Sequence, residues 1–415
     1  YDWLPRNAIS VHRPYAWAKY WSKIGLKITI LTSEKKSFDK PLDLCLPELS
    51  VTLVEVPYGD IFYSFGAIFN SPSFRSFAKK IKNFFIKRCK IEIDPRAPWY
   101  DAAKPYAVKL AKDADVVVST FGPPAAHQLA SVMKIENPRL KWVADYRDLW
   151  SQRHTGDTPY RVRHTMRKVE ISTVATYADA VTTVSDNMVF QLSELIKKPV
   201  FRVSNGFDTS ESDVIERLEK PFQPNTDPLR IVYTGILYRG YRDPTPLLRA
   251  LVSLKNRGLI SKNSVTLDFY GDRVEVAREL SDNPQFAPFI RLMGHVTRDK
   301  ALDAQRDAGL LLLLESSEPE ARGVLTGKIF EYLVAGRPIL CVGSSPEYEI
   351  GEVLRETKTG IVIGPEQISV MQDLLLEVIN SPSQPYWYKP DSREILRYSR
   401  RTQALYMLEE IILKI

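Results

Sequence analysis

Residues 309–340 read GLLLLLESSEPEARGVLTGKIFEYLVAGRPIL, and this stretch decides the fold class. An apolar run typical of a buried strand is followed by an acidic loop, by the apolar spacing of a helix, and by a second apolar run at 338–342. Two neighbouring strands joined through a helix pair in parallel, because a parallel connection needs a crossover. The stretch therefore predicts one unit of a parallel α/β sheet.

The same alternation of short β-branched runs and amphipathic helical patterns continues through most of the 415 residues. A single core stops growing near about 250 residues, so we expect two domains. We predict an α/β protein with two doubly wound parallel sheets, the first of which has a further strand before Tyr1. The predicted strands lie at 27–32, 50–56, 115–119, 141–144, 180–184 and 201–203, and then at 229–234, 265–270, 289–292, 309–314, 338–342 and 360–362.

The domain boundary is predicted from composition. Residues 209–228 are polar, contain three prolines and lack a clean apolar period, which is typical of a connection between domains. We therefore expect an N-terminal domain at 1–208 and a C-terminal domain at 229–391. The final helix, at about 392–415, is expected to pack back on the first domain.

Cysteine usage and hydropathy restrict the class of protein. Cys45, Cys89 and Cys341 stand far apart, with no CxxC pair and no neighbouring His cluster, which favours neither a disulfide framework nor a zinc site. No apolar run approaches the roughly 18 residues that span a bilayer, and no secretory leader opens the chain. We expect a cytoplasmic protein, either soluble or peripheral on the inner face of the membrane.

The start of the helix after the acidic loop favours an anionic ligand. Gly323, Thr326 and Gly327 are small residues that would leave backbone N–H groups exposed at a helix N-terminus, where a pyrophosphate docks. Lys328 would add a cation, and Glu331, one turn further, would reach the hydroxyls of a ribose. The alternative is an ordinary strand–loop–helix connection with a solvated glutamate.

This stretch resembles the donor-site signature of retaining GT-B glycosyltransferases of the family four group, in which two glutamates flank seven residues. By that resemblance Glu331 is the glutamate that binds ribose. The first glutamate, which holds the transferred sugar, falls on Gly323, so the chain departs from the pattern there. Glu318 or Glu320 would substitute for it, or backbone N–H groups alone would serve.

Further segments resemble the same family in the same order. Residues 203–208 (VSNGFD) and 178–185 (ADAVTTVS) match its Asn-Gly-x-Asp turn and its Ala-Asp-x-Val strand. In 233–243 (YTGILYRGYRD), a loop with Gly235 and either Arg239 or Arg242 would neutralise the leaving diphosphate. His295 would lie near the base, although a simple loop position is the alternative. The donor residues implied are Gly235, Arg239, Arg242, His295, Glu320, Gly323, Thr326, Gly327, Lys328 and Glu331.

Two segments of the first half resemble the acceptor side of the family. They are 119–127 (STFGPPAAH) and 144–150 (ADYRDLW), which match its Ser-x-Pro-Pro element followed by His and its Asp-x-Arg-Asp-x-Trp element. The alternative is Asp–Arg pairing that only fixes a loop. The resemblance implies catalytic contacts from His127, Asp145 and Arg147, with His127 a candidate base, and acceptor or cleft contacts from Asn7, Arg13, Pro123 and Asp148.

A basic helix is predicted at 74–90. Its apolar residues recur at helical spacing, and it contains seven positive and no negative side chains, which equals the formal net charge of +7 of the whole chain. A basic amphipathic helix with aromatic residues suits an anionic membrane surface, whereas a core-packed helix with a solvated face is the alternative. No nucleic-acid recognition motif accompanies the charge. The expected membrane contacts are Phe77, Lys79, Lys80, Phe84 and Lys87.

Several other chemistries lack their motifs. There is no Gly-x-x-x-x-Gly-Lys-Ser/Thr loop and no Gly-x-Ser-x-Gly elbow, and Asp113-Ala114-Asp115 precedes its strand rather than following it.

The resemblance implies two Rossmann-like domains with an interdomain cleft. It also implies hexosyl or N-acetylhexosaminyl transfer from a nucleotide sugar, expected to be a UDP-sugar, to a glycan or lipid-linked acceptor in polysaccharide biosynthesis. No metal, cofactor or nucleic acid is expected. The competing hypotheses are a GT-B nucleotide-sugar epimerase and a non-catalytic module associated with membrane or nucleic acid.

Overall fold

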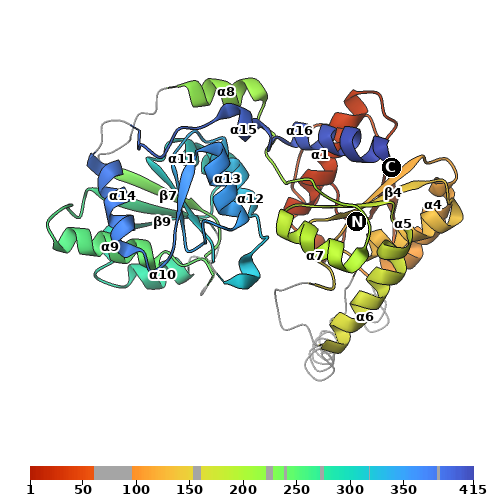
Figure 1. Ribbon diagram of the computed structural model, residues 1–415, viewed down its shortest axis with the longest axis horizontal. Helices are drawn as coiled ribbons and strands as arrows, with labels where there is room; N and C mark the ends of the chain where they lie inside the picture. The colour runs from red at the N-terminus through yellow and green to blue at the C-terminus, as the bar shows by residue number, and fades with distance from the viewer. Residues whose placement is uncertain are drawn as a thin grey trace. The chain divides into compact units, whose positions relative to one another are not determined.

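The structure, a computed structural model, describes residues 1–59, 96–152, 160–220, 228–237, 241–271, 275–316, 318–380 and 384–415. The chain divides into two compact units. Unit 1 comprises Tyr1–Ser204 and Gln403–Ile415, and unit 2 comprises Asn205–Thr402. Both are built from parallel strands and covering helices (Figure 1), as the alternating pattern predicts.

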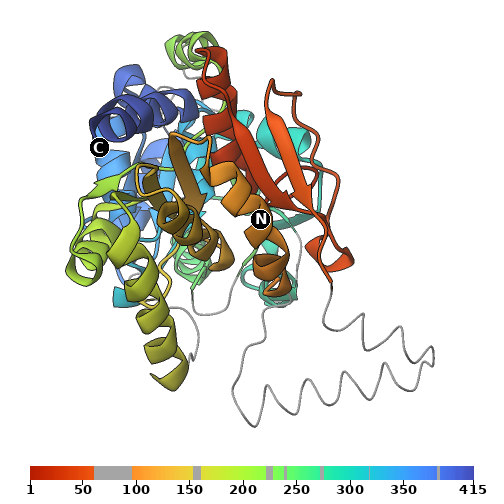
Figure 2. The same cartoon turned by 90° about the vertical axis from the view of Figure 1, so that its right-hand side faces the viewer.

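Unit 1 contains two parallel sheets, which Figure 2 shows from the side. The smaller pairs β1 (Thr29–Ser33) with β2 (Thr52–Val56), and the larger has the order β3-β4-β5-β6. The strands of the larger sheet are β3 (Val116–Thr120), β4 (Lys141–Tyr146), β5 (Ala180–Thr183) and β6 (Val200–Arg202). The helices are α1 (Ile9–Lys23), α4 (Pro98–Ala111), α5 (Ala125–Glu136), α6 (Tyr160–Glu170), which continues as the π-helical segment η2 (Ile171–Ala175), and α7 (Asp186–Ile196).

The end of the chain completes unit 1. Met407 and Ile411, in the segment after α16 (Arg400–Tyr406), pack with Trp17, Trp21 and Val143 in one apolar cluster. The Trp21 indole also donates to the carbonyl of Ala404 at 2.8 Å. The predicted helix at 392–415 is therefore not one element: α15 (Ser392–Leu396) belongs to unit 2, and the part from Gln403 onward belongs to unit 1.

Unit 2 has one six-stranded parallel sheet in the order β12-β11-β10-β7-β8-β9. The run Leu310–Leu314 forms β10, and its leucines alternate between two buried clusters, so both faces of the strand are covered. The other strands are β7 (Leu229–Thr234), β8 (Val265–Tyr270), β9 (Ile290–Gly294), β11 (Ile339–Val342) and β12 (Gly360–Ile363). The helices are α9 (Thr245–Asn256), α10 (Glu275–Ser281), α11 (Arg298–Arg306), α12 (Gly327–Leu333), α13 (Glu349–Thr357) and α14 (Ile368–Asn380).

The strand order of unit 2 predicts where a ligand binds. From β7 the chain builds outward through β8 to β9, and it then returns to the other side of β7 to place β10. The topological switch point therefore lies between β7 and β10. Ligands of open α/β sheets bind beyond the carboxyl ends of the strands at this point.

One prediction about the connection between domains is wrong. Residues 209–228 include a helix, α8 (Glu211–Glu219), whose start is capped by the Ser210 hydroxyl accepting from the amide of Asp213 at 3.2 Å. Val214 is fully buried in a cluster of unit 2. The cap, Val214, the partly buried Leu218 and a hydrogen bond from Arg217 to the carbonyl of Val334 hold this helix, although its apolar period is too short to reveal it.

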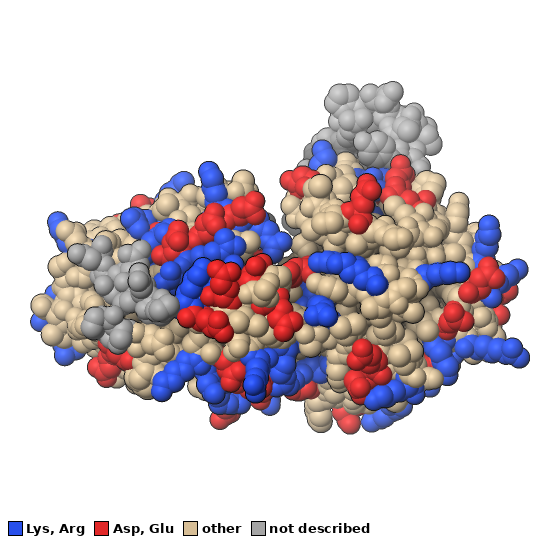
Figure 3. All heavy atoms as spheres, turned by 90° about the horizontal axis from the view of Figure 1, so that it is seen from above, with Lys and Arg blue, Asp and Glu red and all other residues tan. Residues whose placement is uncertain are grey.

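The described surface mixes charges of both signs. On the face shown in Figure 3, Lys and Arg side chains are interspersed with Asp and Glu. Among the described residues, none of the helices combines the length and apolar character needed to cross a bilayer.

Candidate functional site

A partly buried lysine, Lys328, lies at the switch point of unit 2. Gly235 follows β7 and Glu315 follows β10, and Lys328 reaches this edge from the first turn of α12. The Lys328 ammonium donates to the Tyr233 hydroxyl at 3.1 Å and lies 4.7 Å from the centre of the Tyr233 ring. The sequence prediction of Lys328 and Gly235 in one site is therefore consistent with the geometry, whereas sequence analysis did not single out Tyr233.

Gly235 is the residue that makes room for this lysine. Its φ is +137°, and a Cβ atom there would overlap Cε and Nζ of Lys328. A side chain at this position would thus both strain the backbone and displace the ammonium. The position of Lys328 therefore explains why residue 235 is a glycine.

The charges around Lys328 are incompletely balanced. Burial, followed by the neighbouring Arg242 charge, lowers the pKa of Lys328 to about 8, although Glu315 and Glu331 oppose the shift. Burial also raises the pKa of Glu315, whose Oε1 lies 4.0 Å from Arg242 Nη2 and has no hydrogen-bond partner among the described residues. Two cations, Lys328 and Arg242, thus lie close to Glu315 at this strand end, where an anionic ligand would be attracted.

Glu331 lies one turn beyond Lys328 and is partly exposed, with 32% of its side chain accessible. Its carboxylate accepts from Arg298 Nη2 at 3.1 Å and from Gln305 Nε2 at 3.5 Å. Gln305 Nε2 also donates to the Thr234 hydroxyl at 3.0 Å, which connects Glu331 to the end of β7. The carboxylate is thus positioned at the same edge as Lys328, and an exposed arginine occupies it in the free protein.

The predicted anion site at the start of the helix needs a correction. The N–H of Gly323 is not exposed for a ligand, because it donates to the buried Glu349 carboxylate at 2.7 Å, and Gly323 lies four residues before the helix begins. Gly323 has a φ of +87°, which favours glycine for a conformational reason. Thr326 is the N-cap of α12, with no hydrogen bond from its side chain to the helix, and Gly327 is its first residue.

The remaining predicted donor residues are less closely associated with the site at Lys328. His295 is exposed and follows β9, the edge strand, which β8 separates from β7. Arg239 lies outside the described residues, and Glu320 lies in the short helix η4 (Pro319–Ala321), where only the backbone is described. These positions stay predictions.

In unit 1, Asp145 is held in a buried ion pair. Its carboxylate accepts from Arg13 Nη2 at 2.7 Å, from Arg13 Nε at 3.1 Å and from the Thr182 hydroxyl at 2.8 Å, and it is completely inaccessible. Arg13 Nη1 also donates to the carbonyl of Ser204 at 3.0 Å. The geometry favours the alternative of a structural Asp–Arg pair, with Arg13 rather than Arg147 as the partner.

His127 is buried in an aromatic cluster. Its ring centre lies 4.8 Å from that of Tyr146, and its Nδ1 lies 2.7 Å from the Ser119 hydroxyl, which accepts from the Trp142 indole at 2.8 Å. The indole can only donate, whereas the Ser119 hydroxyl and His127 Nδ1 share a hydrogen bond whose donor depends on the imidazole tautomer. Burial lowers the pKa of His127 to about 3, so the ring is neutral. Nε2 is buried without a hydrogen-bond partner among the described residues, and the low pKa makes His127 a weak base.

Arg147 is a largely buried cation that directly follows β4, at the carboxyl ends of the unit 1 strands. Its Nη2 donates to the carbonyl of Phe121 at 2.5 Å, and Asp2 lies 4.0 Å away, while Nε is buried without a described partner. Burial lowers its pKa. Gly122, with a φ of +99°, admits the guanidinium, because a Cβ there would come within 2.9 Å of Nη2. Pro123, buried after a cis bond to Gly122, continues this loop.

Asn7 and Asp148 are placed less definitely. The Asn7 side chain donates to Asp43 at 2.9 Å in an exposed loop contact, and Asp148 is exposed one residue after Arg147. A loop contact explains Asn7 without a ligand. Of the predicted acceptor residues, Pro123 and Asp148 lie near the predicted catalytic residue Arg147, whereas Arg13 pairs with Asp145.

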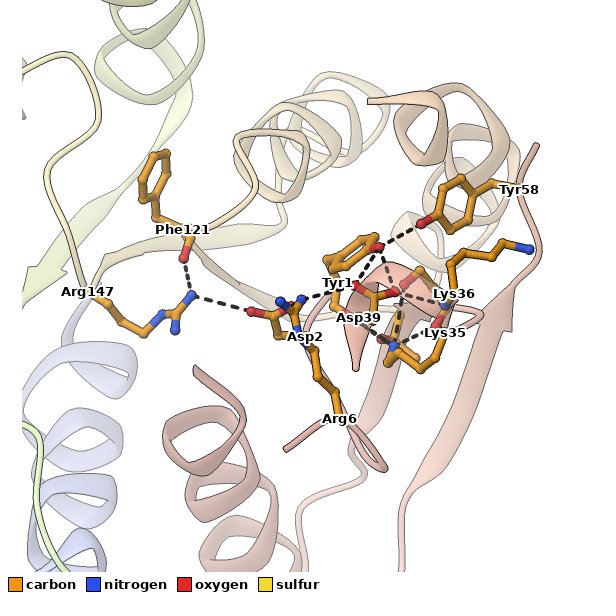
Figure 4. A network of polar contacts seen from close by, with 11 residues as sticks. Tyr1, Asp2, Arg6, Lys35, Lys36, Asp39, Tyr58, Phe121 and Arg147 are labelled. Atoms are coloured by element: carbon orange, nitrogen blue, oxygen red, sulfur yellow. Dashed lines mark hydrogen bonds and ion pairs between the residues drawn. The ribbon is translucent and has the colours of Figure 1, made fainter. Parts of the chain in front are cut away.

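Figure 4 shows a polar network, beside Arg147, that the sequence did not reveal. Asp39 accepts from the Tyr1 hydroxyl at 3.0 Å and lies 3.2 Å from Arg6, which also pairs with Asp2. Lys35, whose pKa burial lowers to about 8, donates to the carbonyl of Tyr1 at 2.9 Å. The sequence contains one signal that could have pointed to this network: Lys35 lies two residues beyond β1, at the carboxyl end of a strand.

The remaining predictions concern a basic helix at 74–90 and the absence of a metal site. The basic helix at 74–90, with Phe77, Lys79, Lys80, Phe84 and Lys87, lies outside the described residues. In the part of the chain that the structure describes, no group of three or more His, Cys, Asp or Glu side chains is arranged to hold a metal ion.

Comparisons with known proteins identify the fold. No family model and no curated protein matches the sequence. The glycosyltransferase from Rickettsia africae ESF-5 is similar with a TM-score of 0.56 at 15% identity, over 92% of this chain and 97% of that chain. WaaG, a glycosyltransferase involved in lipopolysaccharide biosynthesis, has a TM-score of 0.53 at 14% identity, over 96% and 95%. A chain of the GtfA/B complex has a TM-score of 0.51 at 16% identity, over 75% of this chain and 60% of that longer chain.

Identities this low establish the fold alone. Two units of parallel strands and helices, with similarity over nearly the whole length of two glycosyltransferase structures, define the chain as a protein of the GT-B fold. The fold prediction is confirmed.

Proposed function

We propose that this chain is a glycosyltransferase that moves a hexosyl or N-acetylhexosaminyl group from a nucleotide diphosphate sugar, with a UDP-sugar as the expected donor. The acceptor is a glycan or a lipid-linked glycan, and the transfer is retaining and independent of metal. The observation that carries the proposal is the partly buried Lys328 at the switch point of unit 2, with the charge of Arg242 close by and Glu331 one turn away. The GT-B fold and the resemblance in sequence support it.

The charges suit the two ends of a nucleotide diphosphate. Lys328 and Arg242 bind the diphosphate, whose negative charge increases as the glycosidic bond breaks, so the same contacts stabilise the leaving group. Glu331 accepts from the ribose hydroxyls after exchanging its Arg298 contact for the ligand. The proposed chemistry needs these cations at the leaving group, and it assigns no general base.

Unit 1 contributes the acceptor side in this proposal. Arg147 and the loop at Gly122 and Pro123 lie at the carboxyl ends of β3 and β4, where ligands of such sheets bind. His127 stays neutral in its buried position beside Ser119, and the proposal assigns it no proton transfer. The basic helix at 74–90 is proposed to bring the acceptor side to an anionic, cytoplasmic membrane surface.

The test is donor turnover by the full chain. UDP-, GDP- and ADP-sugars are incubated with glycan and lipid-linked acceptor mixtures, and products are identified by mass spectrometry. The proposal expects a product that is heavier than its acceptor by one sugar, with stoichiometric release of the nucleoside diphosphate. An epimerised sugar without net nucleotide release contradicts transfer and supports the epimerase alternative.

A further inference from the structure

Helix α6 has one strongly basic exposed surface. Within Tyr160–Glu170, the four cations Arg161, Arg163, Arg167 and Lys168 are all exposed, and its single acid, Glu170, is completely buried. Within the described ranges these four cations form no ion pair. The exposed face of the helix therefore has an uncompensated positive charge, unlike the mixed surface of Figure 3.

The inner side of α6 explains how the helix is held. Met166 and Val169 pack against the core cluster of unit 1 that contains Trp150 and Val174, and Glu170 accepts from the amide of Ser151 at 3.2 Å. The helix is thus attached to unit 1 through its second half. Its first half extends away from the strands of unit 1, as both Figure 1 and Figure 2 show.

An exposed aromatic residue lies at the extended end. Tyr160, the first residue of α6, is 80% exposed, and its ring stacks on His164 at 6.0 Å rather than on the core. A tyrosine with an apolar ring and a polar hydroxyl is favoured at the headgroup level of a bilayer. Arginines and lysines around such a ring add about 1 kcal/mol each beside an anionic surface.

We propose that the exposed face of α6 is a docking surface for an anionic lipid bilayer. The four cations bind lipid phosphates, and the Tyr160 ring inserts among the headgroups. This proposal does not depend on the donor site of unit 2.

The test compares two full-length variants of equal charge change. In one, Arg161→Glu, Arg163→Glu and Lys168→Glu reverse three cations of α6. In the matched control, Lys104→Glu, Lys109→Glu and Lys112→Glu reverse three exposed lysines on or directly after α4 of the same unit. Binding is measured by flotation with phosphatidylcholine vesicles that contain phosphatidylglycerol, and with pure phosphatidylcholine vesicles.

We expect the wild-type chain to bind the phosphatidylglycerol vesicles and the α6 variant to bind at least about tenfold more weakly, whereas the α4 variant changes by less than about twofold. Tyr160→Ala is expected to weaken binding severalfold. Equal loss in both triple variants, retained binding of the α6 variant, or failure of the wild-type chain to bind overturns the proposal. Binding of wild type to duplex DNA but not to vesicles overturns it in favour of a nucleic acid.

Circular dichroism and thermal melting verify that each variant folds. If the glutamate variant is unfolded, the neutral set Arg161→Gln, Arg163→Gln and Lys168→Gln replaces it, with the corresponding glutamine set on α4. The neutral set is expected to lower vesicle binding at least about fivefold, and an unchanged affinity contradicts the proposal. Nucleotide binding by the same variants, which we expect to be unchanged, separates this result from any failure of the proposed function.

Discussion

At the scale of single residues, the central feature is a lysine whose charge changes near neutral pH. Partial burial of Lys328 and the positive charge of Arg242 nearby lower the pKa of Lys328 to about 8. Its ammonium is therefore present below about pH 8 and lost above it. A nucleoside diphosphate that binds this ammonium stabilises the protonated form, so its binding must depend on pH in the same range.

The first prediction concerns that pH dependence. We expect the affinity for the preferred nucleoside diphosphate to fall as the pH rises from 7 to 9, because the cation is lost with a pKa of about 8. In Lys328→Arg the charge persists, and the affinity should vary much less over this range. Calorimetric titrations across the range measure both proteins. Equal pH profiles for the two would exclude Lys328 as the titrating contact.

The second prediction separates a ligand-binding carboxylate from a structural ion pair. Glu331→Ala should weaken nucleotide binding severalfold with an unchanged melting temperature, because the ribose loses its acceptor. Arg298→Ala removes the exposed partner of the carboxylate and should leave the affinity unchanged or slightly higher. If both variants weaken binding equally, Glu331 acts by holding Arg298, and its assignment to ribose is wrong.

The third prediction concerns Asp145, for which the geometry shows a structural role. Asp145→Ala should lower the free energy of unfolding by about 3–5 kcal/mol, because it leaves the Arg13 guanidinium buried without its carboxylate. The double variant Asp145→Leu with Arg13→Met should recover much of that loss. Chemical denaturation measures the difference. A stable but inactive Asp145→Ala would restore the catalytic assignment.

Some of these residues could be predicted from the sequence, whereas the partners of others could not. Lys328 and Glu331 were predicted because they follow one another in a single segment. The partner of Asp145 was not, since Arg13 is 132 positions away and only the folded chain brings them together. The use of the Gly323 amide by Glu349 was missed for the same reason, because α13 contributes the carboxylate.

At the scale of elements, long apolar runs were predictable and short capped ones were not. The strands of both units begin and end within one to two residues of most of the predictions, because each is a short run rich in apolar or β-branched residues. Helix α8 was missed, since its structure depends on one buried valine and a serine cap. The exposed basic face of α6 was also not singled out, although all of its cations are visible in the sequence.

The fourth prediction belongs to the loop after β7. Gly235→Ala should displace the Lys328 ammonium, because the new methyl group would overlap Cε and Nζ, and the φ of +137° adds about 1–3 kcal/mol of backbone strain. We expect weaker nucleotide binding together with a lower melting temperature. Gly258→Ala, which also has a positive φ but open space around it, controls for strain alone. Equal nucleotide affinity in the two variants would contradict the packing argument.

At the scale of the whole molecule, two parallel α/β units of the GT-B fold contain different chemistry at their strand ends. Unit 2 has a partly buried lysine and an arginine around one carboxylate, and unit 1 has Arg147 beside a network of acids and cations. The two parallel α/β domains were predictable from periodicity and length, and the GT-B fold from the resemblance to a known family. The division of polar residues between ion pairs and ligand contacts was not, because it depends on partners that are distant in sequence.

The most direct test of the central claim is the thermal shift of the full chain with UDP, GDP and ADP, comparing wild type with Lys328→Met and with Lys300→Met. Lys300 is an exposed lysine of the same unit and serves as the matched control. At a concentration near a hundred times its dissociation constant, the preferred nucleotide should stabilise the wild-type chain by about 2.7 kcal/mol, and the melting temperature should rise by several degrees. We predict that the rise is kept in Lys300→Met and largely lost in Lys328→Met. No shift with any of the three nucleotides, or the same shift in both variants, would contradict a nucleotide diphosphate site at Lys328.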